Sequence, residues 1–251
     1  MSGFARAGFT RRRVVLTGGG AVALTVLAGL APARAQAEDV ATLKIATVGA
    51  GREGGTLGKL FARRGHLVMF SSRHPEQLGD LVASAGPNAS AGTVEQAIAF
   101  ADVVLVVVPY SAMEQIGRDH GPALAGKRLI IDVSNPIASR DGEELVRRVN
   151  AEGGPGLATA KWLGAQKVVR AFNAIGYARL EQEAERGGQA GIPIAGDDPE
   201  AVALASGLIR NLGFEPVLVG GLAFGRYLVP GTPLAGVHTP QEIRSLAEGL
   251  K

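Results

Sequence analysis

The chain has 251 residues, of which 26 are Lys or Arg, 23 are Asp or Glu and none is Cys, and its formal net charge is +3. The absence of cysteine excludes disulfides, thiol catalysis and metal sites built on thiolates. Five arginines and no acidic residue lie in residues 1–35, so the rest of the chain has 21 basic and 23 acidic residues, a net charge of −2. No basic stripe or aromatic platform then remains, and we expect no nucleic-acid partner.

Residues 1–35 have the order of a secretory signal. The arginines Arg12 and Arg13 precede an apolar stretch from Thr17 to Leu30, which is followed by the small-x-small motif Ala33-Arg34-Ala35. This order predicts a signal peptide, and the paired arginines favour the twin-arginine route. We therefore expect a periplasmic or extracellular protein with no stable membrane span after signal removal. The alternative is an uncleaved anchor, although the Gly- and Ala-rich run is barely long enough to span a bilayer.

A strand expected over residues 43–48 runs into a glycine-rich loop, Gly49-x-Gly51-x-x-Gly54, and then into a helix expected over 54–64. In a dinucleotide-binding fold, Gly49 permits the tight turn and Gly51 lets a pyrophosphate approach the backbone. Gly54 lets the helix pack closely against the strand. The N-terminus of such a helix also offers N–H groups and the positive end of its dipole to the phosphates.

The second expected strand, residues 67–70, ends in Ser71-Ser72-Arg73-His74, where a dinucleotide fold contacts the adenosine ribose. NAD-binding proteins place Asp or Glu there to accept a hydrogen bond from the 2′-hydroxyl, and this segment has no acidic residue. The Ser72 hydroxyl and the Arg73 guanidinium instead suit a 2′-phosphate. We predict that the chain prefers NADP(H) to NAD(H). The alternative is a turn with a solvated arginine.

The remaining apolar runs alternate with helix-like segments, which is typical of a parallel sheet with helices on both faces. We predict an α/β fold, a Rossmann-type doubly wound, mostly parallel sheet with a short C-terminal extension. The nucleotide-binding domain is expected over 42–220 and the extension over 221–251. The further expected elements are helix 75–85, strand 89–92, helix 93–100 with Thr93 as N-cap, strand 101–108, helix 113–124, strand 128–133, helix 143–149, helix 157–163, strand 167–172, helix 177–185, strand 192–195, helix 199–212, strand 215–219 and helix 240–250.

Ligands in open α/β sheets bind beyond the carboxyl ends of the strands. The residues expected there are Pro109, Asn135, Pro136, Phe172 and Asn173. Backbone stiffened by proline can hold a nicotinamide flat, and the two neutral amides suit orientation rather than proton transfer. In the alternative interpretation each asparagine only stabilises its own turn.

No proton-transfer machinery is evident in the sequence. The histidines His66, His74, His120 and His238 are scattered, and none pairs with an acid or a metal ligand at a recognisable spacing. A glycine-rich run before Lys161 is faintly similar to hydroxyacid dehydrogenases, but we expect Lys161 to be a surface residue. We therefore predict no catalytic side chain and no metal site. A nucleotide loop and a flat pocket are what direct hydride transfer between two ring systems requires.

Six sequence blocks occur in a recognisable order: Gly49–Gly55, Ser72-Arg73-x-Pro75-Glu76, Ala101–Pro109, Ile131–Pro136, Val168–Asn173 and Ile194–Glu200. Together they resemble the NADPH-dependent coenzyme F420 reductases, whose acceptor is a deazaflavin, and relatives such as the cytosolic domain of metalloreductases. The resemblance implies that the glycine loop holds the pyrophosphate and that Ser72 and Arg73 hold the 2′-phosphate. It also places Pro109 and Asn135 near the nicotinamide, and Phe172 and Asn173 near the facing pocket.

The chain departs from this family at three places. Arg52-Glu53 stands where Asn and an apolar residue are usual; Arg52 could add a pyrophosphate contact and Glu53 could weaken one. Gln77 stands where some members have a further basic residue for the 2′-phosphate, which would soften the NADP preference. The third place is residues 221–236, where an acceptor pocket would be completed and where the chain is short.

We therefore expect an exported NADP(H)-dependent oxidoreductase that transfers hydride directly between the nicotinamide and a planar acceptor, deazaflavin F420 or a flavin-like compound. The alternative is an exported NADP-binding sensor or partner subunit without turnover. A dehydrogenase of small hydroxy acids or imines would need a proton donor that the sequence does not offer. A homodimer agrees with the resemblance, but no residue of the chain requires one.

Overall fold

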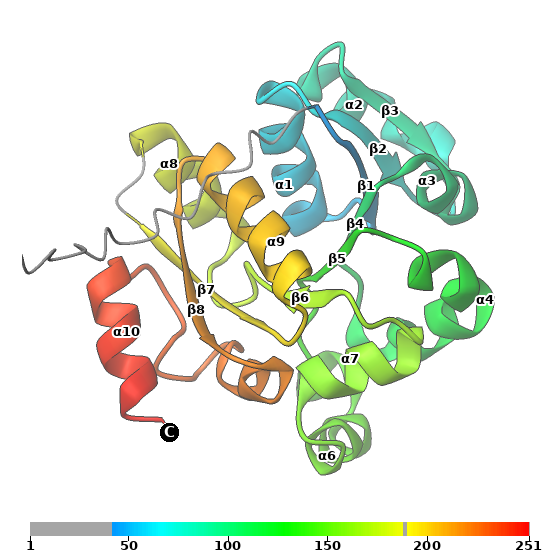
Figure 1. Cartoon of the computed structure of the whole chain (residues 1–251). Helices are drawn as coiled ribbons and strands as arrows, with labels where there is room; N and C mark the ends of the chain where they lie inside the picture. The colour runs from blue at the N-terminus through cyan, green and yellow to red at the C-terminus, as the bar shows by residue number, and fades with distance from the viewer. Residues whose placement is uncertain (1–41, 188–189, 251) are drawn as a thin grey trace, which may run out of the picture. The chain divides into compact units, whose positions relative to one another are not determined.

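A computed structural model describes residues 42–187 and 190–250, in which eight strands form one sheet in the order β3-β2-β1-β4-β5-β6-β7-β8 (Figure 1). The expected signal segment, residues 1–35, lies outside the described residues. The strands are β1 (Lys44–Val48), β2 (Leu67–Ser71), β3 (Ala89–Gly92), β4 (Val103–Val106), β5 (Leu129–Asp132), β6 (Val168–Arg170), β7 (Gly191–Gly196) and β8 (Glu215–Gly220).

Strands β1 to β6 are parallel, β7 is antiparallel to β6, and β8 is parallel to β7. The prediction of a doubly wound, mostly parallel α/β sheet is confirmed. The register aligns the last residues of five neighbouring strands in one row: Ser71, Val48, Val106, Asp132 and Arg170. The segments that follow these residues therefore begin along one edge of the sheet. The chain changes direction there between β1 and β4, which is where this fold class binds ligands.

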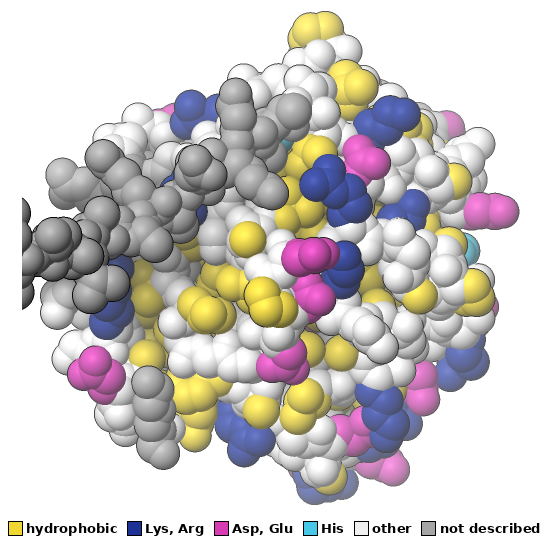
Figure 2. Space-filling view, in the orientation of Figure 1, with side chains coloured by type: hydrophobic (Ala, Val, Ile, Leu, Met, Phe, Trp, Pro, Cys, Tyr) yellow, Lys and Arg dark blue, Asp and Glu magenta, His cyan; other side chains and the backbone are white. Residues whose placement is uncertain are grey.

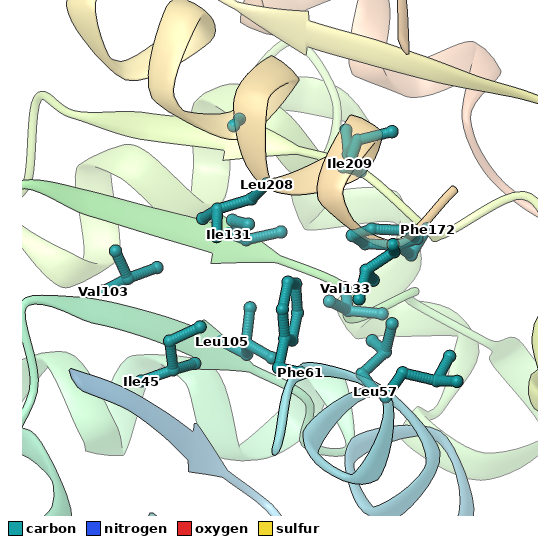
Figure 3. Packing of buried hydrophobic residues seen from close by; sticks show 14 of the residues in the cluster. Ile45, Leu57, Phe61, Val103, Leu105, Ile131, Val133, Phe172, Leu208 and Ile209 are labelled. Carbon is teal, nitrogen blue, oxygen red and sulfur yellow. The ribbon is translucent and has the colours of Figure 1, made fainter. Parts of the chain in front are cut away.

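Helices cover both faces of the sheet. One apolar cluster joins the sheet to α1 (Arg52–Arg63), α2 (Gly79–Ala85), α8 (Tyr177–Arg186) and α9 (Pro199–Asn211). Figure 3 shows its centre, with Phe61 from α1 and Leu208 from α9 approaching Leu105 and Ile131 of the sheet. A second cluster joins the other face to α3 (Val94–Phe100), α4 (Met113–Ala125), α6 (Glu143–Ala151) and α7 (Pro155–Leu163). Short helical turns occur at η1 (Pro75–Leu78), η2 (Tyr110–Ala112) and α5 (Ala138–Asp141).

Two helices begin at residues whose local hydrogen bonds explain where each helix starts. Helix α1 begins at Arg52, two residues before the expected start, because the Gly51 carbonyl already accepts from the N–H of Gly55 at 2.7 Å. Helix α3 begins after Thr93 as expected. The Thr93 hydroxyl accepts from the N–H of Gln96 at 3.2 Å, and Gln96 Oε1 accepts from the N–H of Thr93 at 2.9 Å. This reciprocal pair satisfies two backbone donors that the first turn leaves free.

Residues 221–250 pack on β7 and β8. They comprise the short helix η3 (Leu222–Tyr227), an ordered loop and α10 (Pro240–Glu248). Leu228, Leu234 and Ile243 form a third apolar cluster with the two strands. The loop is hydrogen-bonded to the sheet and its edge, since the N–H of Gly236 donates to the Ala174 carbonyl at 2.7 Å. This segment thus shares a core with the last two strands and reaches the strand ends.

The surface carries charges of both signs. On the face in Figure 2, Lys and Arg side chains are interspersed with Asp and Glu, and no continuous basic patch is visible among the described residues of that face. Within residues 42–187 and 190–250, no helix has the length and apolar character that a membrane span needs.

The N-cap of α3 gives a stability prediction. Thr93→Ala should lower the free energy of unfolding by about 1 kcal/mol, because the N–H of Gln96 loses its acceptor. Urea unfolding followed by circular dichroism measures this change. Ser245→Ala, which removes an exposed hydroxyl from α10, serves as control and should change stability by less than about 0.5 kcal/mol. Equal effects of the two substitutions would contradict the capping role.

Candidate active site

A cleft of about 570 Å³ lies at the carboxyl edge of the sheet. It brings together eight of the residues that the sequence predicted: Gly51, Arg52, Glu53, Gly54, Pro109, Asn135, Phe172 and Asn173. Its remaining lining comes from the strand ends and the C-terminal loop: Val107, Val108, Val133, Ser134, Ile137, Arg140, Ala174, Ile175, Gly176, Pro230, Gly231, Ala235 and Gly236. The other predicted residues, Gly49, Ser72, Arg73 and Pro136, do not line the cleft.

Two glycines hold the loop against the sheet. Gly49 has a φ of +104°, and a Cβ there would overlap the carbonyl oxygen of Val107. A Cβ at Gly54 would overlap the Gly49 carbonyl oxygen in turn. These contacts explain why Gly49 is needed although it does not line the cleft.

Gly51 is different, because a Cβ on this residue would meet no atom of the described chain within 4 Å. The protein's own packing therefore does not require glycine at this position, and the open space faces the cleft. Gly51 is also the N-cap of α1 and provides no side-chain cap, so N–H groups of the first turn have no side-chain acceptor there. The arrangement fits a diphosphate that approaches the backbone closely.

Ser72 and Arg73 lie beside the glycine loop, because Ser71 at the end of β2 pairs with Val48 at the end of β1. Ser72 is half-buried, and its Oγ accepts from the N–H of His74 at 3.0 Å. Arg73 is exposed and makes no hydrogen bond or ion pair with any residue that the structure describes. The nearest acidic residue in sequence, Glu76, is 3.3 Å from the His74 ring. The guanidinium thus stays available for a phosphate.

Arg52 and Glu53 both contact Tyr177, at the start of α8. The Arg52 guanidinium lies over the tyrosine ring, 5.8 Å from its centroid, and Glu53 Oε2 accepts from the N–H of Tyr177 at 3.0 Å. The two residues that depart from the family pattern therefore join the glycine loop to the start of α8, next to Gly176 of the cleft lining. The second carboxyl oxygen of Glu53 is buried and has no hydrogen-bond partner among the described residues. Burial raises the pKa of Glu53 to about 7, against the opposing effect of the Tyr177 N–H.

Phe172 follows β6 with a φ of +65°, a left-handed conformation that is uncommon for an aromatic residue. Its ring is buried beside Val133 in the core (Figure 3). The left-handed turn after Ala171 is followed directly by Asn173, whose carbonyl accepts from Asn135 Nδ2 at 2.8 Å. Such strained residues are characteristic of functional sites, where the surrounding structure maintains them.

A polar network behind the cleft holds these two asparagines. Asp132 and Arg170, the last residues of β5 and β6, form a fully buried ion pair at 2.6 Å. Arg170 also donates to the Ser134 carbonyl at 3.0 Å and to Asn135 Oδ1 at 3.0 Å. Thr159 donates to Asp132 at 2.8 Å. Burial raises the pKa of Asp132, and the neighbouring guanidinium opposes this effect.

This network was not predicted from the sequence, although one signal was present. Asp132 and Arg170 are the charged residues at the ends of otherwise apolar strands. Arg140, which lines the cleft and donates to the Asn135 carbonyl at 2.6 Å, was not predicted either.

None of the four histidines lines the cleft. Buried His66 accepts from the N–H of Leu43 at 3.1 Å and contacts Asn211 at 3.3 Å, and burial lowers its pKa. His120 lies in α4, within the helix expected over residues 113–124. Lys161 is an exposed helix residue that pairs with Glu152 at 3.0 Å, as expected. Within the described chain, no three His, Cys, Asp or Glu residues are grouped as metal ligands would be.

Comparison with known proteins confirms the resemblance. Residues 44–136 match the family model for coenzyme F420-dependent NADP oxidoreductases. The metalloreductase STEAP3 of Rattus norvegicus is 31% identical over 186 residues, which cover 73% of this chain and 35% of the relative. The chain thus spans about a third of the length of this curated relative.

Solved structures agree with the fold. A hypothetical protein from Sinorhizobium meliloti superposes with a TM-score of 0.66 at 26% identity, covering 79% of this chain and 96% of that one. A protein assigned as an F420-dependent NADP reductase, from Arthrobacter sp. FB24, superposes with a TM-score of 0.59 at 21% identity, covering 73% and 87%. The chain is therefore similar to NADP-dependent oxidoreductases of the Rossmann type.

The raised pKa of Glu53 gives a pH prediction. The carboxyl is largely neutral below about pH 7, and above it the first turn of α1 carries a negative charge, which disfavours a diphosphate there. The dissociation constant for NAD+ should therefore rise roughly threefold to tenfold between pH 6 and pH 8. Isothermal titration with NAD+, which lacks a titrating 2′-phosphate, measures this rise.

Two variants separate Glu53 from other groups. Glu53→Gln should remove most of the pH dependence, whereas Glu181→Gln, on the neighbouring helix α8, should retain it. A Glu53→Gln protein with the wild-type pH profile would show that another group is responsible.

Proposed function

We propose that this chain, an NADP-dependent oxidoreductase by its family match, is exported and transfers hydride directly between the nicotinamide of NADP(H) and a planar acceptor. The observation that carries the proposal is the composition of the cleft at the ends of β5 and β6. Two neutral amides, prolines, apolar side chains and Arg140 meet there, and among the described lining residues no histidine does. The Arg140 guanidinium stays protonated and so is no proton relay. Direct hydride transfer needs two carbons held in contact and no proton relay.

The residues present fit NADP(H). The open space at Gly51 and the first turn of α1 would hold the diphosphate, with Arg52 adding a positive charge. Ser72 and Arg73 would hold the 2′-phosphate, since both follow β2 on the side next to the glycine loop. The bound cofactor would supply the hydride. Glu53 lies at the phosphate end of the cleft, so its carboxyl affects binding rather than the transfer.

The other side of the cleft would hold the nicotinamide and its acceptor. Pro109 and Asn135 would position the nicotinamide, and Asn173, with the backbone of Phe172, would face the second ring system. Pro230, Gly231, Ala235 and Gly236 line the same cleft from residues 221–251, which we propose complete the acceptor pocket. Ile137 at the rim is 37% exposed, which offers apolar surface to a flat ring. A deazaflavin such as F420 or a flavin matches this description.

One observation favours a second function. Glu53 places a carboxyl at the phosphate end of the cleft, which suits weak or regulated binding better than turnover. The chain would then be an NADP-binding sensor or partner subunit.

Export would require a tightly held nucleotide, because free NADP(H) is expected to be scarce outside the cytoplasmic membrane. The protein would fold around its nucleotide in the cytoplasm and leave by the twin-arginine route with the nucleotide bound. The paired arginines Arg12 and Arg13 support this proposal.

A turnover assay distinguishes the two functions. Purified protein should oxidise NADPH when F420 or FMN is supplied, and Gly51→Val should raise the dissociation constant for NADPH at least tenfold, about 1.4 kcal/mol. The variant should still fold, as circular dichroism checks, because a Cβ at this position meets no atom of the described chain within 4 Å. NADPH binding without turnover of either acceptor would favour the sensor.

Arg73 gives a cofactor-specificity prediction. Arg73→Ala should weaken NADPH binding by roughly 1.5–3 kcal/mol, the range for a charge-assisted hydrogen bond, and should leave NADH binding nearly unchanged. Arg147→Ala, on the exposed face of α6, is the control. Titration calorimetry with both nucleotides measures the difference, and equal losses for NADPH and NADH would refute the role of Arg73.

The export proposal is tested by changing Arg12 and Arg13 together to Lys. The protein should remain in the cytoplasmic fraction and still bind NADP+ there. Cell fractionation followed by immunoblotting measures how the protein is distributed between the compartments. Continued export of the variant would indicate an export signal of another kind.

A further inference from the structure

The side-chain amide of Asn135 has a fixed orientation. Its Oδ1 lies 3.0 Å from Nη2 of Arg170, and a guanidinium can only donate. Its Nδ2 donates to the Asn173 carbonyl at 2.8 Å. An amide nitrogen carries two hydrogens, so one N–H of Asn135 is left over among the contacts of the described residues. Asn135 lines the cleft and is half-buried.

The side-chain amide of Asn173 is also fixed, but here the oxygen rather than an N–H is left without a partner. Its Nδ2 donates to the Ser134 carbonyl at 3.3 Å, and a carbonyl can only accept. Its Oδ1 is therefore the free end. This oxygen is buried, has no hydrogen-bond partner among the described residues, and belongs to a residue that is only 5% exposed and lines the cleft. A buried acceptor without a donor is costly, so a donor from a ligand is expected there.

Arg170 cannot easily turn away from Asn135. Its side chain is completely buried, and the Asp132 carboxylate holds one end of the guanidinium. A Cβ at Gly225 would lie 2.5 Å from Arg170 Cδ, and one at Gly156 would lie 3.1 Å from the same atom. These close backbone approaches enclose the side chain. The direction in which Asn135 and Asn173 present their donor and acceptor is therefore set from behind the cleft.

We propose that Asn173 Oδ1 and the remaining N–H of Asn135 together bind an amide group of the ligand, accepting its N–H and donating to its carbonyl. Two ligands of the proposed function carry this pairing: the carboxamide of nicotinamide and the cyclic imide edge of a flavin or deazaflavin. The inference rests on the proposed function only in that one of these rings must bind in the cleft. It adds that Asn135 and Asn173 select rings that carry an N–H donor next to a carbonyl acceptor.

Ligand analogues that lack the N–H test the proposal. In the nicotinamide arm, NADP+ is compared with its 3-acetylpyridine analogue, in which a methyl replaces the amide nitrogen. In the flavin arm, riboflavin is compared with N3-methylriboflavin. Titration calorimetry or fluorescence quenching gives the dissociation constants, so neither arm requires turnover.

Wild-type protein should bind the parent compound roughly tenfold more tightly than the analogue in at least one arm. The arm in which this happens identifies the ring that the pair contacts. In Asn173→Ala the ratio for that arm should fall to about one, while Asn150→Ala, on the exposed side of α6, should keep it. Using the ratio cancels any general weakening of binding in the variant.

Ratios near one in both arms of wild-type protein would overturn the proposal, even where Asn173→Ala fails to fold. A wild-type preference that persists in Asn173→Ala would also overturn it, as would failure of both parent compounds to bind. The proposed function can fail separately. If wild-type protein discriminates in the nicotinamide arm, Asn173→Ala loses this discrimination, and no acceptor oxidises NADPH, then this inference holds and the proposed enzyme activity is contradicted.

Discussion

The buried ion pair of Asp132 and Arg170 connects the strand ends that line one side of the cleft. It joins the ends of β5 and β6, and Arg170 also reaches Asn135 and, at 3.4 Å, the Leu228 carbonyl of the C-terminal segment. Removing either charged partner would leave the other buried and unpaired, at a cost of about 3–5 kcal/mol. Replacing both by apolar residues could preserve stability. It would also remove the donor that orients Asn135. The ion pair therefore matters to the cleft because it fixes the orientation of this side chain.

The opposite end of the cleft depends on close backbone approaches in the glycine loop. Gly49 and Gly54 let α1 pack against the end of β1, and Gly51 leaves open space in front of the helix. Arg52 and Glu53 then connect this end to Tyr177 of α8. The departure from the family pattern thus has a structural role across the cleft. It also leaves one titratable group, Glu53, in the first turn of α1.

Much of the fold could be predicted because its signals are local. Apolar runs without alternation indicate strands buried on both faces, and the glycine loop indicates the turn between β1 and α1. Gly51 and Asn173 could be assigned to the edge of the sheet because parallel strands end at the same side. The antiparallel direction of β7 could not be predicted, since direction depends on where α8 crosses the sheet and not on the composition of Ile192–Ala195.

The polar network was beyond sequence reasoning for a related reason. Asp132 and Arg170 are 38 residues apart and become partners only through the register of β5 and β6. The contact of Glu53 with Tyr177 spans 124 residues. Its raised pKa comes from burial by a helix whose position no local pattern gives. The left-handed conformation of Phe172 likewise depends on its buried surroundings, because aromatic residues rarely adopt it alone.

The proposed function depends on direct hydride transfer between two rings, without a proton relay beside them. It is tested with NADPH that carries deuterium at nicotinamide C4, in either configuration, and with F420 as acceptor in ordinary water. One of the two labelled forms should give reduced F420 with deuterium at C5, a carbon position that does not exchange with solvent, as detected by mass spectrometry. Reduced F420 without the label from both forms, or no reduction of any planar acceptor, would contradict direct transfer.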